Sequence, residues 1–447
     1  GVSGIGIDLE STVHVVGLPP LDRMYVERPT GFRRASAVEP EHLAQALNRA
    51  WVKFHVGVVT CRQPLPIVCK TPMPLRGRCP PYRVNFRGEL GTTHWNGLHR
   101  DLRAMKRQYG LLLFILLAGC GQQPAEFHHT ILEFDTLINV TLYDVDEQVA
   151  KRAFADLDQQ FAHYQSSWTP YEPSDLTQIN QAIAAGETVR VAPSVLPLIA
   201  RSIPLAEQTG NLYNPAIGKL IKLWQFHRHD EPDIRPPDPD RIAALVGADP
   251  KLADLALQSN ELHCDNPQVE LNFGAFAKGY AVDTAMRWLR EMGIRNAIFA
   301  VGGDVKALGR HGDRAWRVGI RHPRQDTVMA TLDLQGEEGV STSGDYERYF
   351  FYQGKRYHHI LDPRTGYPAQ GTQAVTVVHR DSGLADVAAT ALFIAGPQHW
   401  LELARKLKLT LVFFVDGDGQ VQVTPELMER LKFNPAIPTS IHVTPPL

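Results

Sequence analysis

The chain has 447 residues, and 44% of them are hydrophobic, so it is long enough for two or three domains with a sizeable core. Its 46 basic and 48 acidic residues nearly balance. This balance lacks the basic excess of nucleic-acid-binding proteins, and we expect no nucleic-acid partner. Cys61, Cys69 and Cys79 lack the paired short spacings of a zinc site, which leaves Cys120 and Cys264 to consider.

A secretion signal is predicted in the interior of the chain. Met105, Lys106 and Arg107 form a short basic segment, residues 111–117 are apolar, and Leu-Ala-Gly-Cys at 117–120 matches a bacterial lipobox. The apolar run is shorter than the roughly 20 residues that a membrane-spanning helix needs. A buried core helix is the alternative interpretation. We interpret residues 105–120 as a lipoprotein signal peptide with lipid attachment at Cys120.

This signal sets the expected organisation of the first part of the chain. A signal peptide cannot work behind about a hundred preceding residues, and residues 1–104 are proline-rich with few sustained periodicities. We therefore expect residues 1–104 to be a non-native or disordered upstream extension, and residues 121–129 to be a tether. The mature protein is expected to be a bacterial lipoprotein that faces the periplasm. We expect the inner membrane to carry the anchor, although Gly121 does not fix the choice of membrane.

The rest of the chain alternates strand-like and helix-like patterns without a simple βαβ repeat, which predicts an α+β fold. We expect strands at 131–143, 315–321, 329–334, 349–352, 373–379 and 409–415. Helices are expected at 146–164, 193–208, 241–246, 385–394 and 398–406. The charged, proline-rich stretch 230–240 is predicted to be an exposed loop.

The stretch Leu271–Asp304 organises the rest of the domain. It reads LNFGAFAKGYAVDTAMRWLREMGIRNAIFAVGGD, and its apolar residues recur at helical spacing from about Lys278 to Met292. Gly293 suits the left-handed position after a helix, and the apolar run 294–301 suits a buried strand. Glycine-rich turns therefore bracket one helix. Lys278 would lie at its N-terminus, where unpaired N–H groups favour anions.

Five motifs in order resemble those of the ApbE family. They are FGAFAKGYAVD at 273–283, AVGGD at 300–304, STSGDY at 341–346, HHILDPRTG at 358–366 and DVAAT at 386–390. The resemblance covers roughly 130–424. Members of this family are FAD:protein FMN transferases. The resemblance implies an α+β flavin transferase domain of mixed sheets with flanking helices, over residues 130–435.

A metal site is predicted at Asp386 and Thr390. In a helix these side chains lie one turn apart on one face, where a carboxylate and a hydroxyl can hold a hard cation such as Mg²⁺. The alternative is that Thr390 bonds its own helix backbone and Asp386 caps the helix. The resemblance assigns both to the metal, together with the backbone carbonyl of Ala275.

The resemblance also implies the residues that contact the flavin of FAD. They are Phe134, Tyr171, Leu212, Tyr213, Asn214, Asn272, Lys278, His358 and Ile360. Tyr171 and Asn214 have simpler interpretations, as a packing aromatic in a loop and as a turn residue before Pro215. Asn214 and Asn272 stand where the family has Asp. An amide carries no charge, so a role that needs a carboxylate is in doubt at Asn214, whereas at Asn272 the change concerns the detailed hydrogen bonding of the flavin and not its binding.

His359 is the predicted catalytic residue. The resemblance places it beside the reacting phosphate, and imidazole is well suited to accept a hydroxyl proton near neutral pH. The adjacent His358 is chemically equivalent in sequence, although strand alternation points the two side chains to opposite faces.

The expected function follows from the resemblance. The chain is expected to be a Mg²⁺-dependent FAD:protein FMN transferase, which attaches FMN through a phosphoester to a threonine of a partner flavoprotein and releases AMP. FAD is the substrate, and the partner is expected to be a subunit of a membrane-associated electron-transport system. The alternatives are a FAD pyrophosphatase that gives FMN and AMP, and a flavin-binding lipoprotein without activity.

Overall fold

The computed structural model of the protein describes residues 124–226, 234–437 and 439–447, and these belong to one compact unit. The predicted upstream extension, the signal peptide and Cys120 lie outside the described residues. Within them, no helix is both long enough and apolar enough to cross a membrane.

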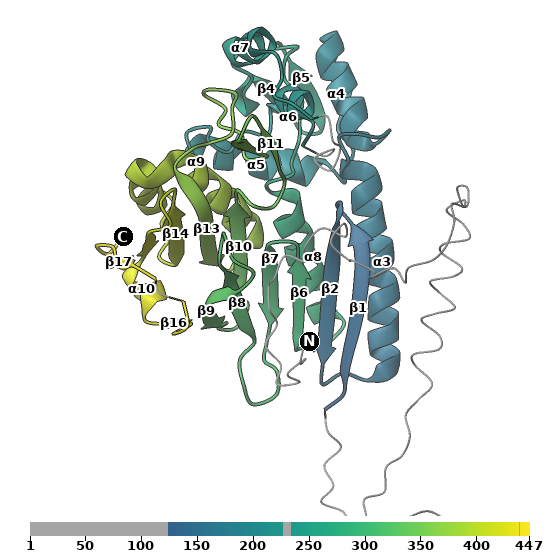
Figure 1. The fold of residues 1–447 in the computed structure, drawn as a ribbon. Helices are drawn as coiled ribbons and strands as arrows, with labels where there is room; N and C mark the ends of the chain where they lie inside the picture. Colours follow the sequence, from purple (N-terminus) through teal and green to yellow (C-terminus); the bar gives the residue numbers. More distant parts are fainter. Residues whose placement is uncertain (1–123, 227–233, 438) are drawn as a thin grey trace, which may run out of the picture. The chain divides into compact units, whose positions relative to one another are not determined.

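A nine-stranded sheet forms the centre of the unit (Figure 1). Its strands, in spatial order, are β1 (Glu126–Glu133), β2 (Thr136–Tyr143), β6 (Ala297–Val301), β7 (Asp304–Leu308), β10 (Gly339–Gly344), β13 (Thr372–His379), β14 (Val412–Asp416), β15 (Val421–Val423) and β17 (Ile441–Val443). All neighbours are antiparallel except β15 and β17, which are parallel. The predicted α+β class with mixed sheets is confirmed.

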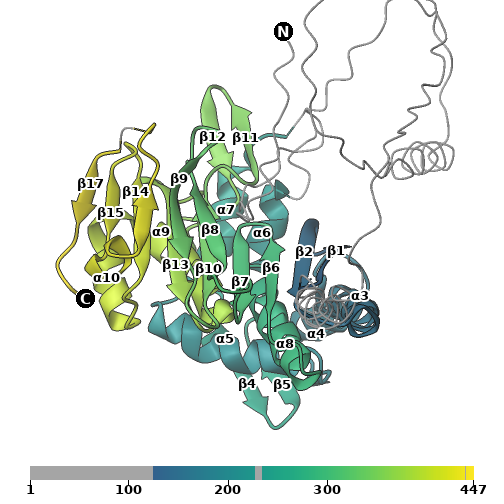
Figure 2. The same cartoon turned by 90° about the horizontal axis from the view of Figure 1, so that it is seen from below.

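Both faces of this sheet are covered (Figures 1 and 2). One face carries α3 (Glu147–Trp168), α8 (Ala277–Glu291) and α9 (Ser382–Lys406), whose apolar residues share two core clusters with the sheet. The other face packs against a three-stranded sheet of β8 (Arg317–Arg321), β9 (Val328–Asp333) and β16 (Leu431–Phe433). Because both faces are covered, β13 is buried along nearly its whole length without alternation.

The remaining elements gather mainly at one end of the large sheet (Figure 1). They include α4 (Asp175–Ala185), α5 (Leu196–Gln208), α6 (Gly218–Trp224), α7 (Pro239–Gly247), the small sheet β3 (Val189–Arg190), β4 (Leu255–Gln258) and β5 (Glu261–Cys264), and the hairpin β11 (Tyr349–Tyr352) and β12 (Lys355–His358). A single-turn 3₁₀ helix, Leu252–Asp254, precedes β4, and α10 (Pro425–Met428) precedes β16.

Most predicted elements are present, but one prediction was wrong. The expected strand at 131–143 is two strands, because Phe134 and Asp135 adopt left-handed conformations with φ of 58° and 55° and close a two-residue hairpin. The expected helices at 385–394 and 398–406 are confirmed as the two helical parts of α9, which are separated by the non-helical Gly396. Glycine takes φ of 75° there, and Pro397 cannot donate a backbone hydrogen bond.

The boundaries of the domain are also wider than expected. β1 begins at Glu126, inside the predicted tether, because every residue of 126–133 is in register with a residue of β2. At the other end, β17 pairs with β15, so the fold includes residues beyond 435. The expected helix at 278–292 is confirmed within one residue as α8, and the strand expected at 294–301 is shorter, since β6 starts at Ala297.

Close packing of α8 on α9 depends on Gly279. A Cβ atom at this position would lie 2.4 Å from the backbone oxygen of Ser382 and 2.8 Å from the nitrogen of Gly383. Backbone atoms cannot rotate away as a flexible side chain could, so the two helices can approach this closely only when residue 279 has no side chain.

We predict that Gly279→Ala lowers the free energy of unfolding by about 1–3 kcal/mol, because the added methyl forces α8 and α9 apart. Gly247→Ala is the matched control, since no atom lies within 4 Å of a Cβ there. Urea denaturation of both variants measures the effect. Equal stability of the two variants would show that the helices can separate without cost.

Candidate active site

An ion cluster lies where β7, α8 and α9 meet. The ammonium group of Lys278 lies 3.2 Å from an Asp386 carboxylate oxygen and 3.4 Å from an Asp304 oxygen. Lys278 also donates to the backbone carbonyl of Gly274 at 3.2 Å. Both carboxylates are buried, with 8% and 10% of their side chains exposed. One cation therefore faces two buried acids.

The sheet register explains how Asp304 reaches this position. Ile131 pairs with Ile138, Ile138 with Val301, and Val301 with Asp304 across the Gly302–Gly303 corner. Paired residues point to the same face, so Asp304 faces the helices that cover Ile138. Gly302 supplies the φ of 58° that the corner needs.

The cluster holds two acidic groups and one basic group. Burial, together with the like charge of Asp304, raises the pKa of Asp386 to about 7, although Lys278 opposes this shift. The backbone N–H of Gly279 also donates to Asp386. Although burial acts against it, the pKa of Lys278 is raised by the two carboxylates, so its ammonium stays protonated. Two acids share one cation, and the site can accommodate more positive charge.

A second buried ion pair fixes the start of α9. Asp283 accepts from the backbone N–H of Ser382 at 2.7 Å, and Lys306 lies 3.1 Å from the other oxygen of Asp283. Lys306 also donates to the carbonyl of Arg380. Because Asp283 belongs to α8 and Lys306 to β7, these bonds tie α9 to the two elements that carry Lys278 and Asp304.

Two of the predicted metal ligands lie on one face of α9, next to the ion cluster. Asp386 and Thr390 lie one turn apart on α9, as expected, and Thr390 is 3.1 Å from the hydroxyl of Ser343 on β10. Ala275 lies in the turn that leads into α8. Among the described residues, no three His, Cys, Asp or Glu side chains form a metal-binding group. The available donors are instead two carboxylates, hydroxyls and a backbone carbonyl, which is an oxygen set that suits Mg²⁺.

Asn272, Tyr171 and Phe134 lie at the entrance to α8. Asn272 accepts from the backbone N–H of Gly274 at 3.0 Å and hydrogen-bonds the Tyr171 hydroxyl, so its side chain shapes the turn. Phe134 stacks on Trp168 with ring centroids 6.1 Å apart, and its N–H donates to Gln165 at 3.1 Å. Asp135 is close enough to affect the pKa of Tyr171. The structure therefore brings these three predicted flavin contacts together.

His359 lies across from Arg348 at the base of the β11–β12 hairpin. The backbone N–H of His359 donates to the Arg348 carbonyl at 3.0 Å. The ring atom Nδ1 is buried and has no hydrogen-bond partner in the part of the chain that the structure describes. Burial and the charge of Arg348 hold its pKa well below the ordinary value. The ring is therefore neutral at physiological pH.

His358 and Ile360 are held differently. His358 Nε2 donates to the Ala369 carbonyl at 2.9 Å, and its Nδ1 accepts from Ile360 N–H at 3.3 Å. These bonds leave neither ring nitrogen of His358 free for a ligand. Both residues are at least 95% buried, and Ile360 belongs to the core beneath α9.

The triplet Leu212, Tyr213 and Asn214 is also engaged within the protein. Tyr213 is buried, and its hydroxyl is 2.8 Å from that of Ser202. Asn214 donates to the Pro250 carbonyl at 2.8 Å and accepts from Ala216 N–H at 3.0 Å, which is the turn chemistry considered from the sequence. Leu212 packs between two core clusters. These interactions do not test the predicted flavin contacts, which stay predictions.

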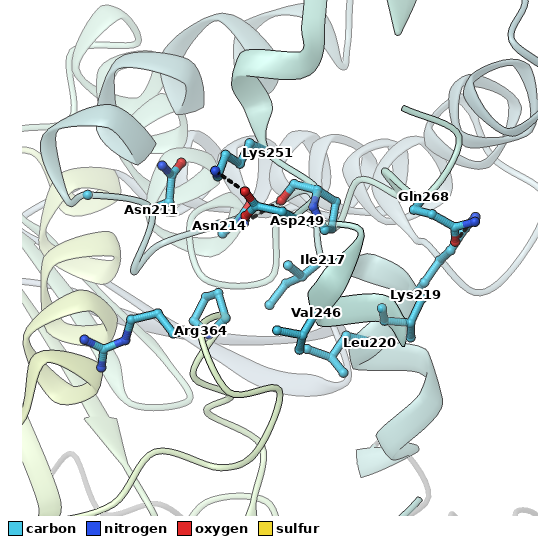
Figure 3. Close-up of a pocket in the computed structure, with 14 residues that line it drawn as sticks. Asn211, Asn214, Ile217, Lys219, Leu220, Val246, Asp249, Lys251, Gln268 and Arg364 are labelled. Atoms are coloured by element: carbon cyan, nitrogen blue, oxygen red, sulfur yellow. Dashed lines mark hydrogen bonds and ion pairs between the residues drawn. The ribbon is translucent and has the colours of Figure 1, made fainter. Parts of the chain in front are cut away.

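A cavity of about 290 Å³ opens beside Asn214 (Figure 3). Ile217, Val246 and Leu220 form an apolar part of its wall, while Asp249 and Lys251 pair with each other above it. None of the ion-cluster residues lines this cavity. Its volume is at the lower limit of small-molecule sites, so it can hold at most part of a dinucleotide.

The sequence analysis missed Asp304 and Arg348. Asp304 ends the AVGGD motif, between two apolar stretches that were expected to be buried. A carboxylate at such a position is seldom buried without a partner, and this signal could have identified Asp304. Arg348 gave no such signal, because its position opposite His359 follows from the pairing of Tyr349 with His358.

Comparisons with known proteins agree on one family. A sequence profile described as the ApbE family matches residues 134–414. The FAD:protein FMN transferase of Rhodobacter capsulatus is 37% identical over 84% of this chain and 71% of its own length. A Klebsiella pneumoniae protein of the same name is 34% identical over 67% of this chain and 91% of its own. The crystal structure of the Thermotoga maritima ApbE protein superposes with a TM-score of 0.61 at 28% identity, covering 69% of this chain and 99% of that one.

Removing one acid should relieve the charge imbalance of the cluster. We predict that Asp304→Asn lowers the pKa of Asp386, because a like charge is lost while Lys278 stays in place. A carboxyl ¹³C NMR titration of the metal-free protein measures this. Asp333→Asn is the control, since Asp333 pairs with Arg317 and Lys432 elsewhere. An unchanged Asp386 titration in Asp304→Asn would contradict the electrostatic account.

Proposed function

The chain belongs to the ApbE family, and from this premise we propose that it is a Mg²⁺-dependent FAD:protein FMN transferase. It attaches FMN through a phosphoester bond to a threonine of a partner flavoprotein and releases AMP. The named relatives support the flavin transfer itself. The metal, the threonine and the leaving group are part of the proposal.

The ion cluster is the observation that carries this function. Asp386 is a buried acid whose pKa is raised to about 7, and it lies next to a second acid and a lysine. Such an arrangement is typical of a site that binds a further cation, more than of a structural ion pair. Mg²⁺ would be held by Asp386, Thr390 and the carbonyl of Ala275. When bound, it neutralises charge on the pyrophosphate of FAD and on the leaving AMP.

The residues of the chain position the substrate. Lys278 lies in the first turn of α8, so its ammonium and the helix N-terminus together favour a phosphate. Arg348 adds a second positive charge, which is felt by both Lys278 and His359. Phe134 and Tyr171 offer aromatic surfaces for the flavin ring at the same entrance.

The chemical step exchanges one phosphorus–oxygen bond for another. The threonine hydroxyl oxygen bonds the phosphorus on the FMN side, and the bond from that phosphorus to the oxygen bridging to AMP breaks. Neutral His359 accepts the hydroxyl proton, which then passes to solvent or AMP. No oxidant or reductant is needed, because the flavin is transferred without a change of redox state. Holding both reactants in line supplies much of the rate.

The partner and the location belong to the same proposal. The acceptor would be a flavoprotein subunit of a membrane-associated electron-transport system, and lipidation at Cys120 would hold the enzyme at the periplasmic side of the inner membrane. The lipobox sequence supports this location. Cys120 lies outside the described residues.

One experiment separates the proposal from its alternatives. The purified protein is incubated with FAD, Mg²⁺ and a bacterial membrane extract, followed by denaturing electrophoresis. A protein band whose flavin fluorescence survives denaturation indicates transfer, and mass spectrometry then identifies the acceptor. Free FMN and AMP without a labelled band would indicate a pyrophosphatase. Unchanged FAD would indicate a flavin-binding lipoprotein, and either result would overturn the proposal.

We predict that Asp386→Ala abolishes Mg²⁺-dependent turnover with the fold intact, because it removes a buried charged ligand. Thr390→Val should be milder, since a hydroxyl contributes less to a hard cation than a carboxylate. Labelling rates across a Mg²⁺ titration measure both effects, and the Mg²⁺-dependent shift in thermal unfolding gives a readout independent of activity. Full activity of Asp386→Ala would place the metal elsewhere.

We predict that Cys120→Ser releases the protein from membranes without reducing its activity in solution, because the thioether-linked lipid would be lost. Fractionation of cells that express each form tests this. A variant that stays in the membrane pellet would show that Cys120 is not the anchor.

A further inference from the structure

One serine beneath α9 has a buried hydroxyl that the fold does not use. Ser341 of β10 is 1% exposed, and its Oγ has no hydrogen-bond partner among the residues that the structure describes. A buried hydroxyl without a partner is costly, and a bound water or ion is one of the few explanations for such a group in a native protein. The direction of this side chain therefore matters for the function.

The sheet register directs Ser341 to the face that carries the ion cluster. Ser341 is in register with Asp304 of β7 on one side and with Val377 of β13 on the other. Residues that pair across neighbouring strands point to the same face of the sheet. Asp304 contacts Lys278, and Val377 belongs to the core cluster beneath α9. The Ser341 hydroxyl therefore points toward the helices and not toward the three-stranded sheet.

Two contacts show how β10 lies against α9. At one end, a Cβ atom on Gly339 would lie 2.5 Å from the Ser382 hydroxyl oxygen. At the other end, the hydroxyl oxygens of Ser343 and Thr390 are 3.1 Å apart. The two spans agree in length, because four residues of a strand cover about 13 Å and eight residues of a helix cover about 12 Å. The strand and the helix therefore run side by side between these contacts.

Ser341 and Asp386 are the midpoints of the two spans, so they lie opposite each other. Asp386 points to β10 as Ser382 and Thr390 do, because residues four apart on a helix share a face. Ser341 thus lies between Asp304, its neighbour in the sheet, and Asp386 on the helix above. Its hydroxyl forms a hydrogen bond with neither carboxylate. It is therefore available to a ligand that the carboxylates attract.

We propose that Ser341 is a further residue of the cation site, where its hydroxyl hydrogen-bonds a water molecule of the bound Mg²⁺. This inference rests on the proposed function, in which Asp386, Thr390 and the Ala275 carbonyl hold the ion. Those three ligands fill half of an octahedral shell, and Mg²⁺ usually keeps several waters. Waters on a buried ion need hydrogen-bonding partners of their own, and the Ser341 hydroxyl supplies one opposite Asp386.

The test measures metal binding and stability separately. Purified wild-type protein and Ser341→Ala are titrated with Mn²⁺ without FAD and again with FAD, and electron paramagnetic resonance follows the free Mn²⁺. Competition by Mg²⁺ then gives the affinity for Mg²⁺ itself. We expect the Kd for both ions to rise by about tenfold in Ser341→Ala, because partners of the metal's ligands typically change the affinity by about 10–100-fold.

Thermal unfolding gives a readout that a purely structural role would move in the other direction. The substitution removes a buried hydroxyl without a partner, so metal-free Ser341→Ala should be at least as stable as wild type. Mg²⁺ should raise the unfolding temperature of the variant less than that of wild type, since weaker binding gives less stabilisation.

Thr342→Val is the matched control. Thr342 is the next residue of β10, and its hydroxyl oxygen is 2.9 Å from that of Thr376, on the opposite face of the sheet. This variant also loses one hydroxyl from the same strand, so it reports any general disturbance of β10. It should keep the metal affinity of wild type.

Every other outcome decides against a particular claim. Unchanged metal affinity in Ser341→Ala would show that the serine only leaves room for α9. An equal loss of affinity in Thr342→Val, or lower metal-free stability in Ser341→Ala, would show that the hydroxyl supports the strand, and would overturn the proposal. Asp386→Ala tests the cation site itself. If that variant binds metal as tightly as wild type, the metal site of the proposed function fails, whereas loss of binding in Asp386→Ala but not in Ser341→Ala overturns only the role of Ser341.

Discussion

The site depends on one lysine that faces two buried carboxylates. Lys278 of α8 is brought to Asp304 of β7 and to Asp386 of the more distant α9, and each contact has a local cause. The absence of a side chain at Gly279 lets α8 approach α9, and the left-handed Gly302 turns the chain so that Asp304 faces the helices. A buried carboxylate without this cation would be costly, so the arrangement of the three elements and the charge of the site are linked.

The same charges connect the fold to the proposed chemistry. Positive groups collect around the entrance, where Lys278 and Arg348 both act on the neutral ring of His359. A pyrophosphate that enters would be attracted to these cations, whereas the two acids behind them would attract a metal ion. Anion-binding and cation-binding groups that lie side by side where β7, α8 and α9 meet suit a reaction in which a metal-bound dinucleotide is cleaved. The Asp283–Lys306 pair fixes the start of α9, so this arrangement is maintained.

The sequence predicted much of this arrangement and missed the rest for physical reasons. Helical spacing located α8 within one residue, and the interval of four between Asp386 and Thr390 placed them on one helix face. Ion pairs between distant segments, such as Lys278 with Asp304 and Asp283 with Lys306, depend on sheet register, which a single sequence does not reveal. The hairpin turn at Phe134 and Asp135 was missed because Phe134, unlike Asp135, is not typical of left-handed turns. His358 and His359 are alike in sequence, and they differ in the structure because both ring nitrogens of His358 are hydrogen-bonded to backbone groups whereas Nδ1 of His359 is not.

The central claim is that the flavin phosphate is transferred to a protein and not to water. The most direct measurement is a time course of AMP release and protein-bound flavin in one reaction with FAD, Mg²⁺ and the purified acceptor. The account predicts one bound FMN for each AMP released, with the acceptor mass increased by one FMN less one water. AMP released together with free FMN, and an acceptor of unchanged mass, would contradict it.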